Sequence, residues 1–146
     1  NNIRWKSYLK NPNIYIGKKL KNINKKNSIL KKNIFHCTLL LSGESEIKKL
    51  NNKFRRKNKS TDVLSFPFYK KKDLLNKLKK DKEVYLGDIV INLNKIKNKS
   101  IKKNFKIEFD RLWIHGLVHL LGYDHKKNKD FYDMMKVEKK FLSYLN

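Results

Sequence analysis

HGLVHLLGYDH, residues 115–125, is the stretch around which this chain is organised, and it holds three of the four histidines. Residues four apart share one face of a helix, so His115 and His119 present their imidazoles to one point. Gly122 can adopt the left-handed backbone conformation that ends a helix. The chain that turns back after it can bring His125 to the same point. Three neutral imidazoles with an open fourth position are typical of a catalytic zinc site. The three histidines are therefore the predicted metal ligands, for one Zn²⁺ per chain.

The spacing H-x-x-x-H-x-x-G-x-x-H is also the spacing of the metzincin metalloprotease signature, with one difference. Metzincins carry glutamate directly after the first histidine, as the general base for peptide hydrolysis. This chain has Gly116 there, and glycine has no group that transfers a proton. The metal cradle is kept and the protease base is absent, so peptide hydrolysis by that mechanism is not expected. The other neighbours of the histidines are mostly apolar, which predicts a buried helix whose imidazoles need partners such as a metal.

Three blocks of the sequence resemble the YbeY-type endoribonucleases, the bacterial factors of ribosomal RNA maturation. Residues 115–125 look like the family signature. Residues 51–68, NNKFRRKNKSTDVLSFPF, are similar to the family's N-x-x-Y-R-G-K-D-K-P-T-D-V-L-S-F-P, and residues 86–91, LGDIVI, resemble its L-G-D-I-V-I strand. The blocks follow the family's order within residues 35–142. Two positions depart from the pattern: Arg56 stands where the family usually has glycine, and Ser60 where it usually has proline.

The resemblance implies a metal-dependent endoribonuclease that cuts single-stranded RNA, notably at the 3′ end of 16S ribosomal RNA, and that acts in ribosome quality control. Its implied partners are ribosomal RNA and the ribosome or small-subunit proteins. Arg55 matches the family's functionally important arginine, and the rigid donor fork of arginine suits a phosphate. Asp124 belongs to the motif, where it would orient an imidazole or carry a proton. Two attacks on phosphorus stay open: by a zinc-activated water, or by the RNA 2′-hydroxyl with that water as base.

Two other functions compete with the nuclease interpretation. In one, the chain is a non-catalytic ribosome assembly factor with a structural zinc. In the other, it is a metallo-hydrolase of a different substrate, peptides included. Gly116 and the formal net charge of +24 disfavour the second alternative.

Four further residues near these motifs have two possible roles each. Tyr123 closes the turn or stacks on a base, and the first role is favoured. Asp88 orients a neighbouring side chain or caps a turn. Met134 and Glu138 match an M-x-x-x-E pattern of the family, and packing with helix support is the favoured role for both.

Composition sets outer limits. At 146 residues the chain fits one domain, residues 1–146. The charge favours a polyanionic partner. The sequence has no Ala or Gln and an excess of Lys, Asn and Ile, which indicates AT-rich coding, so we assign only about half of the excess charge to function.

Cys37 is expected in the core, without a disulfide. No apolar run is long enough to span a membrane and no signal peptide is visible, so a cytoplasmic protein without membrane contact is expected.

Periodicity predicts an α+β fold: a small mixed sheet of three to four strands packed with about five helices, one of them a metzincin-like zinc helix. Strands are expected at 35–41, 63–68 and 85–91, with Pro67 at an edge or a strand end. Helices are expected at 13–26, 44–54, 94–104 (broken near Ser100), 108–121 and 128–145, and residues 69–83 form a mobile loop or a short helix. The expected cap of the second helix is Ser42 or Ser45. His36 is expected to be a packing or surface residue outside the metal cluster. The start shows no counterpart of a first strand that the family has.

Overall fold

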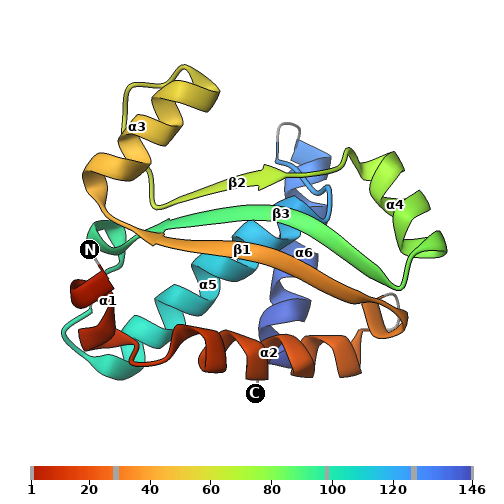
Figure 1. Ribbon diagram of the computed structural model, residues 1–146, viewed down its shortest axis with the longest axis horizontal. Coiled ribbons are helices and arrows are strands. Elements are labelled where there is room, and N and C mark those ends of the chain that lie inside the picture. Colours follow the sequence, from red (N-terminus) through yellow and green to blue (C-terminus); the bar gives the residue numbers. More distant parts are fainter. Residues whose placement is uncertain (1, 28–29, 98, 126–127, 146) are drawn as a thin grey trace.

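The computed structural model of the chain describes residues 2–27, 30–97, 99–125 and 128–145, and it has the expected α+β architecture (Figure 1). Its described elements, in order, are α1 (Asn2–Tyr8), α2 (Pro12–Lys26), β1 (Ile34–Ser42), α3 (Glu44–Arg55), β2 (Val63–Pro67), α4 (Lys71–Lys80), β3 (Glu83–Asn92), α5 (Lys102–Leu120) and α6 (Asn128–Tyr144). Short 3-10 turns occupy Leu30–Lys32 and Leu93–Lys95.

The sheet is mixed, with β3 in the centre. The strand order is β1-β3-β2, and β1 runs parallel to β3 while β2 runs antiparallel to it. The backbone N–H of Asn92 donates to Asp62 and that of Phe68 donates to Leu86. Because bonded and non-bonded pairs alternate in an antiparallel ladder, Ser65 and Pro67 turn their backbone groups to the free edge of β2. Pro67 lacks an N–H, so its place at the edge costs no ladder bond, as its position in the sequence predicts.

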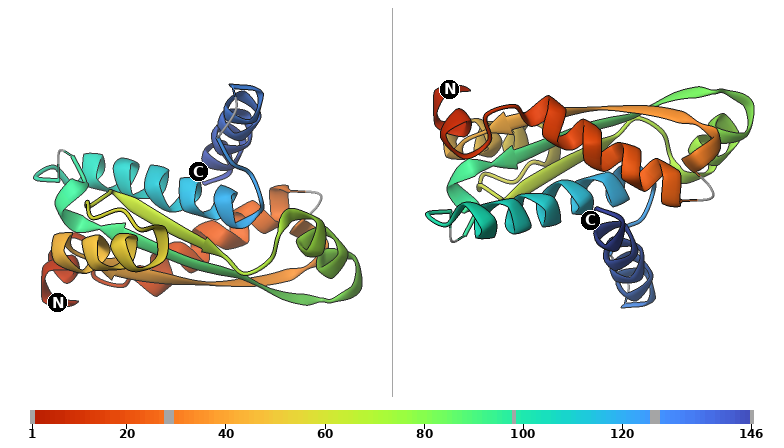
Figure 2. Two further views of the ribbon diagram at one scale, coloured as in Figure 1. Left: turned by 90° about the horizontal axis from the view of Figure 1, so that it is seen from above. Right: turned by 90° about the horizontal axis from the view of Figure 1, so that it is seen from below.

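The two faces of the sheet are covered by different helices. On one face Leu86, Ile89 and Ile91 of β3 belong to the main core together with α5. On the other face Ile47 of α3 packs on Leu64 and Val90. The views along the sheet show α5 on one side, with α6 beyond it, and α3 on the other side (Figure 2). Helix α5 is thus enclosed between the sheet and α6, which explains why it is apolar nearly all round.

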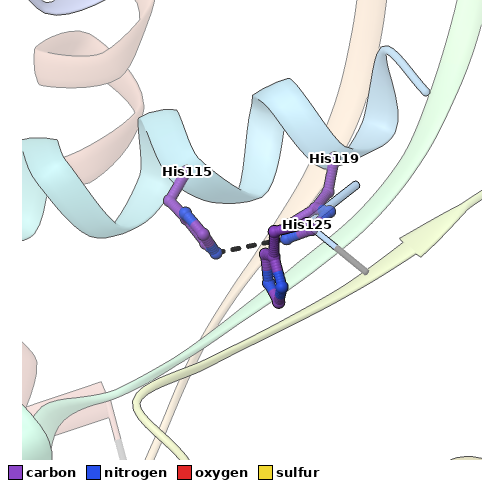
Figure 3. A group of neighbouring side chains, drawn as sticks. All are labelled: His115, His119 and His125. Carbon is purple, nitrogen blue, oxygen red and sulfur yellow. Dashed lines mark hydrogen bonds between the residues drawn. The ribbon is translucent and has the colours of Figure 1, made fainter. Parts of the chain in front are cut away.

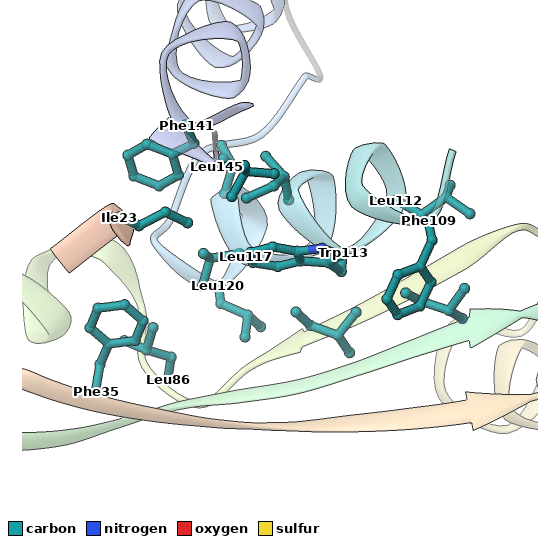
Figure 4. Packing of buried hydrophobic residues seen from close by; sticks show 14 of the residues in the cluster. Ile23, Phe35, Leu86, Phe109, Leu112, Trp113, Leu117, Leu120, Phe141 and Leu145 are labelled. Atoms are coloured by element: carbon teal, nitrogen blue, oxygen red, sulfur yellow. The ribbon is translucent and has the colours of Figure 1, made fainter. Parts of the chain in front are cut away.

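The main core joins segments that are far apart in the sequence. Trp113, Leu117 and Leu120 of α5 lie between the sheet and the C-terminal helix (Figure 4). Phe35 and Leu86 line the sheet side, and Phe141 lines the side of α6. These contacts fix α5 on both sides, and α5 is the element that carries His115 and His119.

Helix α5 is longer than the sequence pattern predicts. It begins at Lys102, six residues before the expected start, and the helix expected at 94–104 is a 3-10 turn followed by the first turn of α5. Phe105 and Phe109 are fully buried one turn apart and stack with ring centroids 5.9 Å apart, which extends the apolar stripe toward the N-terminus. The segment 69–83 contains helix α4, anchored by the buried Leu74.

Several local expectations are wrong. Neither Ser42 nor Ser45 caps α3, whose N-cap is Gly43 without a side-chain hydrogen bond. Phe54 and Phe131, which the apolar spacing of the predicted helices 44–54 and 128–145 places on the inward face, are 58% and 50% exposed. Each packs edge-on against one other ring at the surface, Phe54 against Phe66 and Phe131 against Tyr132.

At the N-terminal end, helix α1 has no counterpart in the expected elements. Its Trp5 is 3% exposed and donates its indole N–H to the carbonyl of Ser42, 3.0 Å away. The next helix, α2, agrees with the helix expected at 13–26. It buries Ile23 fully, although Ile14 on the same helix is 57% exposed.

Candidate metal centre and active site

The three predicted ligands lie together. His115 and His119 come from the last two turns of α5, and His125 follows the turn after it (Figure 3). Each offers one ring nitrogen, and these nitrogens all lie within 4.8 Å of one another. His115 and His119 are half-buried, while His125 is exposed. The cluster is therefore open to solvent on the side of His125.

Gly122 makes the return of the chain possible. Its φ is +87°, and its N–H donates to the carbonyl of His119 at 2.9 Å, while the next N–H, of Tyr123, donates to Val118 at 3.3 Å. This is the left-handed helix end that the sequence pattern predicts. A β-carbon at Gly122 would lie 2.8 Å from the Cβ of Lys71, so α4 packs against the turn and leaves no room for a side chain.

Hydrogen-bond partners fix which nitrogen of His115 and of His119 faces the cluster. Nδ1 of His115 lies 2.5 Å from a carboxylate oxygen of Glu138, and Nδ1 of His119 lies 2.9 Å from the carbonyl oxygen of Tyr123. Both partners accept, so both Nδ1 atoms carry a proton, and in the neutral form of each ring Nε2 presents a lone pair. These two Nε2 atoms are 3.2 Å apart. Two lone pairs at that distance repel each other unless a cation or an additional proton lies between them.

The pair His115 and His119 fits a zinc ion by distance, and His119 fits it also by charge state. Zinc–nitrogen bonds of about 2.0–2.1 Å in a tetrahedral site place two ligating nitrogens about 3.3 Å apart, close to the Nε2 separation of His115 and His119. A metal ligand must be neutral imidazole. Burial lowers the pKa of His119, and the neighbouring His115 lowers it further. The protein thus keeps His119 in the form that binds a metal.

Glu138, for which the sequence favours only packing and helix support, is a direct neighbour of the cluster. Met134, on the same helix, is 2% exposed and has the expected packing role. Glu138 instead reaches across from α6 to His115. A signal was present: Glu138 lies four residues after Met134 and three before the buried Phe141, so it is a carboxylate on the inward face of its helix.

Arg55 is held at the free edge of β2. It is the last residue of α3, and its guanidinium donates to the carbonyl of Ser65, 3.2 Å away. Ser65 is paired with Ile89 on β3, and the side chain of Ile89 packs against Gly116, the neighbour of His115. Arg55 therefore binds the part of the sheet that α5 packs against, and its side chain remains exposed.

The loop between α3 and β2, residues 56–62, is basic through Arg56, Lys57 and Lys59, and two asparagine side chains hold its second half. Asn51 donates to the carbonyl of Lys59 at 2.7 Å, and the buried Asn92 donates to that of Thr61 at 3.1 Å. The carboxylate of Glu44 accepts from Ser60 and, at 2.8 Å, from Asn92, and both bonds hold its pKa below the usual range. Ser60 thus replaces the family's usual proline with a hydrogen bond that ties the loop to α3.

Asp124 and Tyr123 shape the return loop. One carboxylate oxygen of Asp124 accepts the backbone N–H of His125 at 2.8 Å, which orients the third ligand through its main chain. The Nζ of Lys71 lies 4.7 Å from the ring centroid of the half-buried Tyr123, and Tyr123 also packs against the main core. Its position agrees with the structural role that the sequence favours.

The remaining candidates lie on the sheet outside the cluster. Asp88 accepts from the hydroxyl of Tyr85 at 2.5 Å, so it orients a neighbouring side chain and does not cap a turn. His36 is exposed and 3.5 Å from Glu83. Cys37 is half-buried against the core, and burial together with the charge of Asp88 raises its thiol pKa to about 11. Within the described residues, no helix is both long and apolar enough to cross a bilayer.

Three comparisons relate this chain to known proteins. The family model Endoribonuclease YbeY matches residues 6–146. Endoribonuclease YbeY of Pelagibacter ubique is 47% identical over 137 residues, which cover 92% of this chain and 84% of that protein. Its counterpart in Buchnera aphidicola is 44% identical over 118 residues, covering 80% and 72%. The solution structure of TM1509 from Thermotoga maritima superposes with a TM-score of 0.58 at 30% identity, covering 91% of this chain and 80% of that one. The chain belongs to the YbeY family of endoribonucleases.

Proposed function

We propose that this chain is a zinc-dependent endoribonuclease that cuts single-stranded RNA, with the 3′ end of 16S ribosomal RNA as its main target and a part in ribosome quality control. The observation that supports zinc most directly is the pair of Nε2 lone pairs 3.2 Å apart, with His125 as the third ligand. His115, His119 and His125 would hold the ion. Zinc held there would supply Lewis-acid chemistry: activation of a water molecule and polarisation of a phosphate oxygen.

The protein's own residues would bind and orient the RNA. Arg55 would place its donor fork on a phosphate at the edge of β2, where its contact with Ser65 already holds it. The exposed basic loop beside it would attract the RNA backbone without reading the base sequence. Asp124 would keep His125 oriented through the backbone N–H. Gly116 stands where metzincins carry the glutamate that serves as general base for peptide hydrolysis. Its absence favours RNA over peptide as substrate.

The cellular setting follows from the substrate. We propose the cytoplasm as the compartment, because ribosomal RNA is processed there, and the ribosome or a small-subunit protein as the partner that presents the cleavage site. The family model covers residues 6–146, which supports one domain for the whole chain.

The test combines metal content with RNA cleavage, on protein purified without a histidine tag. We expect about one zinc per chain, cleavage of a 16S 3′-end fragment, and loss of cleavage with chelator. His119→Ala should lose metal and cleavage together. A full zinc complement without cleavage would instead favour the assembly factor with a structural zinc, and hydrolysis of casein would favour a peptidase. Absence of metal from protein supplied with zinc would overturn the site assignment.

Variants of Arg55 separate catalysis from RNA binding. Arg55→Ala should keep RNA binding within a few-fold and reduce cleavage by about 100-fold or more, the usual effect of losing a charge-stabilising donor. Arg55→Lys keeps the charge without the fork and should recover little activity. Arg4→Ala, which removes an exposed arginine of α1, is the control and should cleave normally. Loss of RNA binding in proportion to cleavage would mean that Arg55 only attracts RNA.

A further inference from the structure

Glu138 lies directly behind one of the predicted metal ligands. Its carboxylate oxygen is 2.5 Å from Nδ1 of His115, whose Nε2 faces the cluster. The contact joins two helices, because Glu138 is on α6 and His115 is on α5. Both side chains are about one-quarter exposed, His115 at 27% and Glu138 at 22%, so water competes only partly for this hydrogen bond.

The backbone around Glu138 is well anchored. Met134, one turn earlier, is 2% exposed and Phe141, one turn later, is 3% exposed, and both belong to the main core with α5. Glu138 therefore projects from the packed face of α6 and does not reach His115 from a mobile surface. A carboxylate placed this rigidly selects one tautomer and one ring orientation for its histidine.

We propose that Glu138 is a positioning residue of the metal centre: it holds His115 with the Nδ1 proton turned away and the Nε2 lone pair turned toward His119 and His125. The proposal deepens the proposed function and rests on it. His119 is oriented by a neutral acceptor, the carbonyl of Tyr123, whereas His115 is oriented by an anion. A negative charge behind an imidazole increases its basicity as a ligand, and it would offset part of the positive charge of a bound zinc ion.

The test measures metal affinity directly, by competition with a chromophoric chelator at a temperature where every variant is folded. Glu138→Ala should bind zinc about 10- to 100-fold more weakly, the usual cost of losing such an outer partner. Glu138→Gln keeps an oxygen that can accept the Nδ1 proton and loses the charge, so its affinity should fall between those of wild type and Glu138→Ala. Asp133→Ala is the matched control, because it removes an exposed carboxylate from the same helix. Its affinity should stay within two-fold of wild type.

The outcomes separate this proposal from the proposed function. If wild-type protein binds no zinc, the zinc site itself is wrong. If wild type binds zinc and Glu138→Ala binds it equally well, with only a lower melting temperature of the metal-free protein, Glu138 is a packing residue and the proposal fails. If Glu138→Ala does not fold, Glu138→Gln decides, and an affinity equal to that of wild type overturns the role of the charge. Weakening in Asp133→Ala as strong as in Glu138→Ala would mean that helix charge, and not the contact with His115, sets the affinity.

Discussion

Gly116 packs directly on Ile89: a β-carbon at Gly116 would lie 2.6 Å from Cγ2 of Ile89, closer than side chains approach in folded proteins. Gly116, next to the first ligand, therefore has a structural role in addition to lacking the general base of the metzincins. It lets the backbone of α5 lie against β3, which carries Ile89 in the centre of the sheet. A glutamate here would have to displace the side chain of Ile89 or move the helix that holds two of the ligands.

We expect Gly116→Ala to lower the free energy of unfolding by about 1–3 kcal/mol, because overpacking outweighs the higher helix propensity of alanine. Gly116→Glu should fold poorly and should not create a peptidase. Urea unfolding followed by circular dichroism measures the first effect, and a casein assay checks the second.

The same substitution in α2 provides the control. Gly17 lies inside that helix, and among the described residues a β-carbon added there would meet no neighbouring element within 4 Å. Gly17→Ala should therefore raise the free energy of unfolding by about 0.5–1 kcal/mol. Equal changes at Gly116 and Gly17 would show that packing against Ile89 has no energetic effect.

Arg56 adopts a left-handed conformation, with φ 55° and ψ 31°, at the C-terminal end of α3. The resemblance leads one to expect glycine at this position, and glycine adopts this conformation without a steric penalty. Arg56→Gly should raise stability by about 1 kcal/mol and Arg56→Val should lower it by at least as much. Thermal unfolding measures both. Asn58→Gly is the control in the same loop and should not stabilise, and a gain there equal to that of Arg56→Gly would contradict the strain argument.

The parts of the fold that could be predicted from sequence are those encoded by local patterns. The histidine spacing and Gly122 define the metal centre within eleven residues, because a helix face and a left-handed turn are local geometry. Pro67 indicates its edge position because it lacks an N–H. The three strands are apolar runs between polar turns, and their positions agree with the sheet.

The parts that escaped prediction depend on contacts distant in sequence. Glu138 is 23 residues from His115, and only the packing of α6 on α5 shows that it reaches the ring. Helix α1 is short, and its Trp5 is explained by a bond to Ser42, 37 residues away. Phe54 fits an inward stripe by periodicity, yet its ring meets the sheet only edge-on at Phe66 and stays 58% exposed.

Asp110 joins α5 to α2 inside the protein. Its carboxylate accepts from Trp113 at 2.9 Å and from the hydroxyl of Tyr15 at 3.0 Å, and it lies 2.8 Å from Nζ of Lys19. Asp110→Ala should cost about 3 kcal/mol, because it leaves a poorly hydrated ammonium and two donors without their acceptor. Asp133→Ala, at an exposed site, should change stability by less than about 0.5 kcal/mol.

A double-mutant cycle with Lys19→Met isolates the ion pair from the other two bonds. Because the two side chains are largely buried, at 17% and 12% exposure, we expect a coupling of about 1–3 kcal/mol. Urea unfolding of the four proteins measures it. Additive effects of the two substitutions would mean that Tyr15 and Trp113 account for the whole contribution of Asp110.

Cys37 should be a poor nucleophile in the native protein. Burial, and to a lesser extent the charge of Asp88, raises its pKa from 9.0 to about 11. At pH 8 the native protein then has about 100-fold less thiolate than the unfolded chain, and the thiolate is the reactive form. We expect the reaction with an aromatic disulfide reagent to be slower by about that factor in buffer than in denaturant. Asp88→Asn should speed the native reaction only modestly, because burial is the larger cause. Equal rates with and without denaturant would show that the thiol is freely accessible and ionises normally.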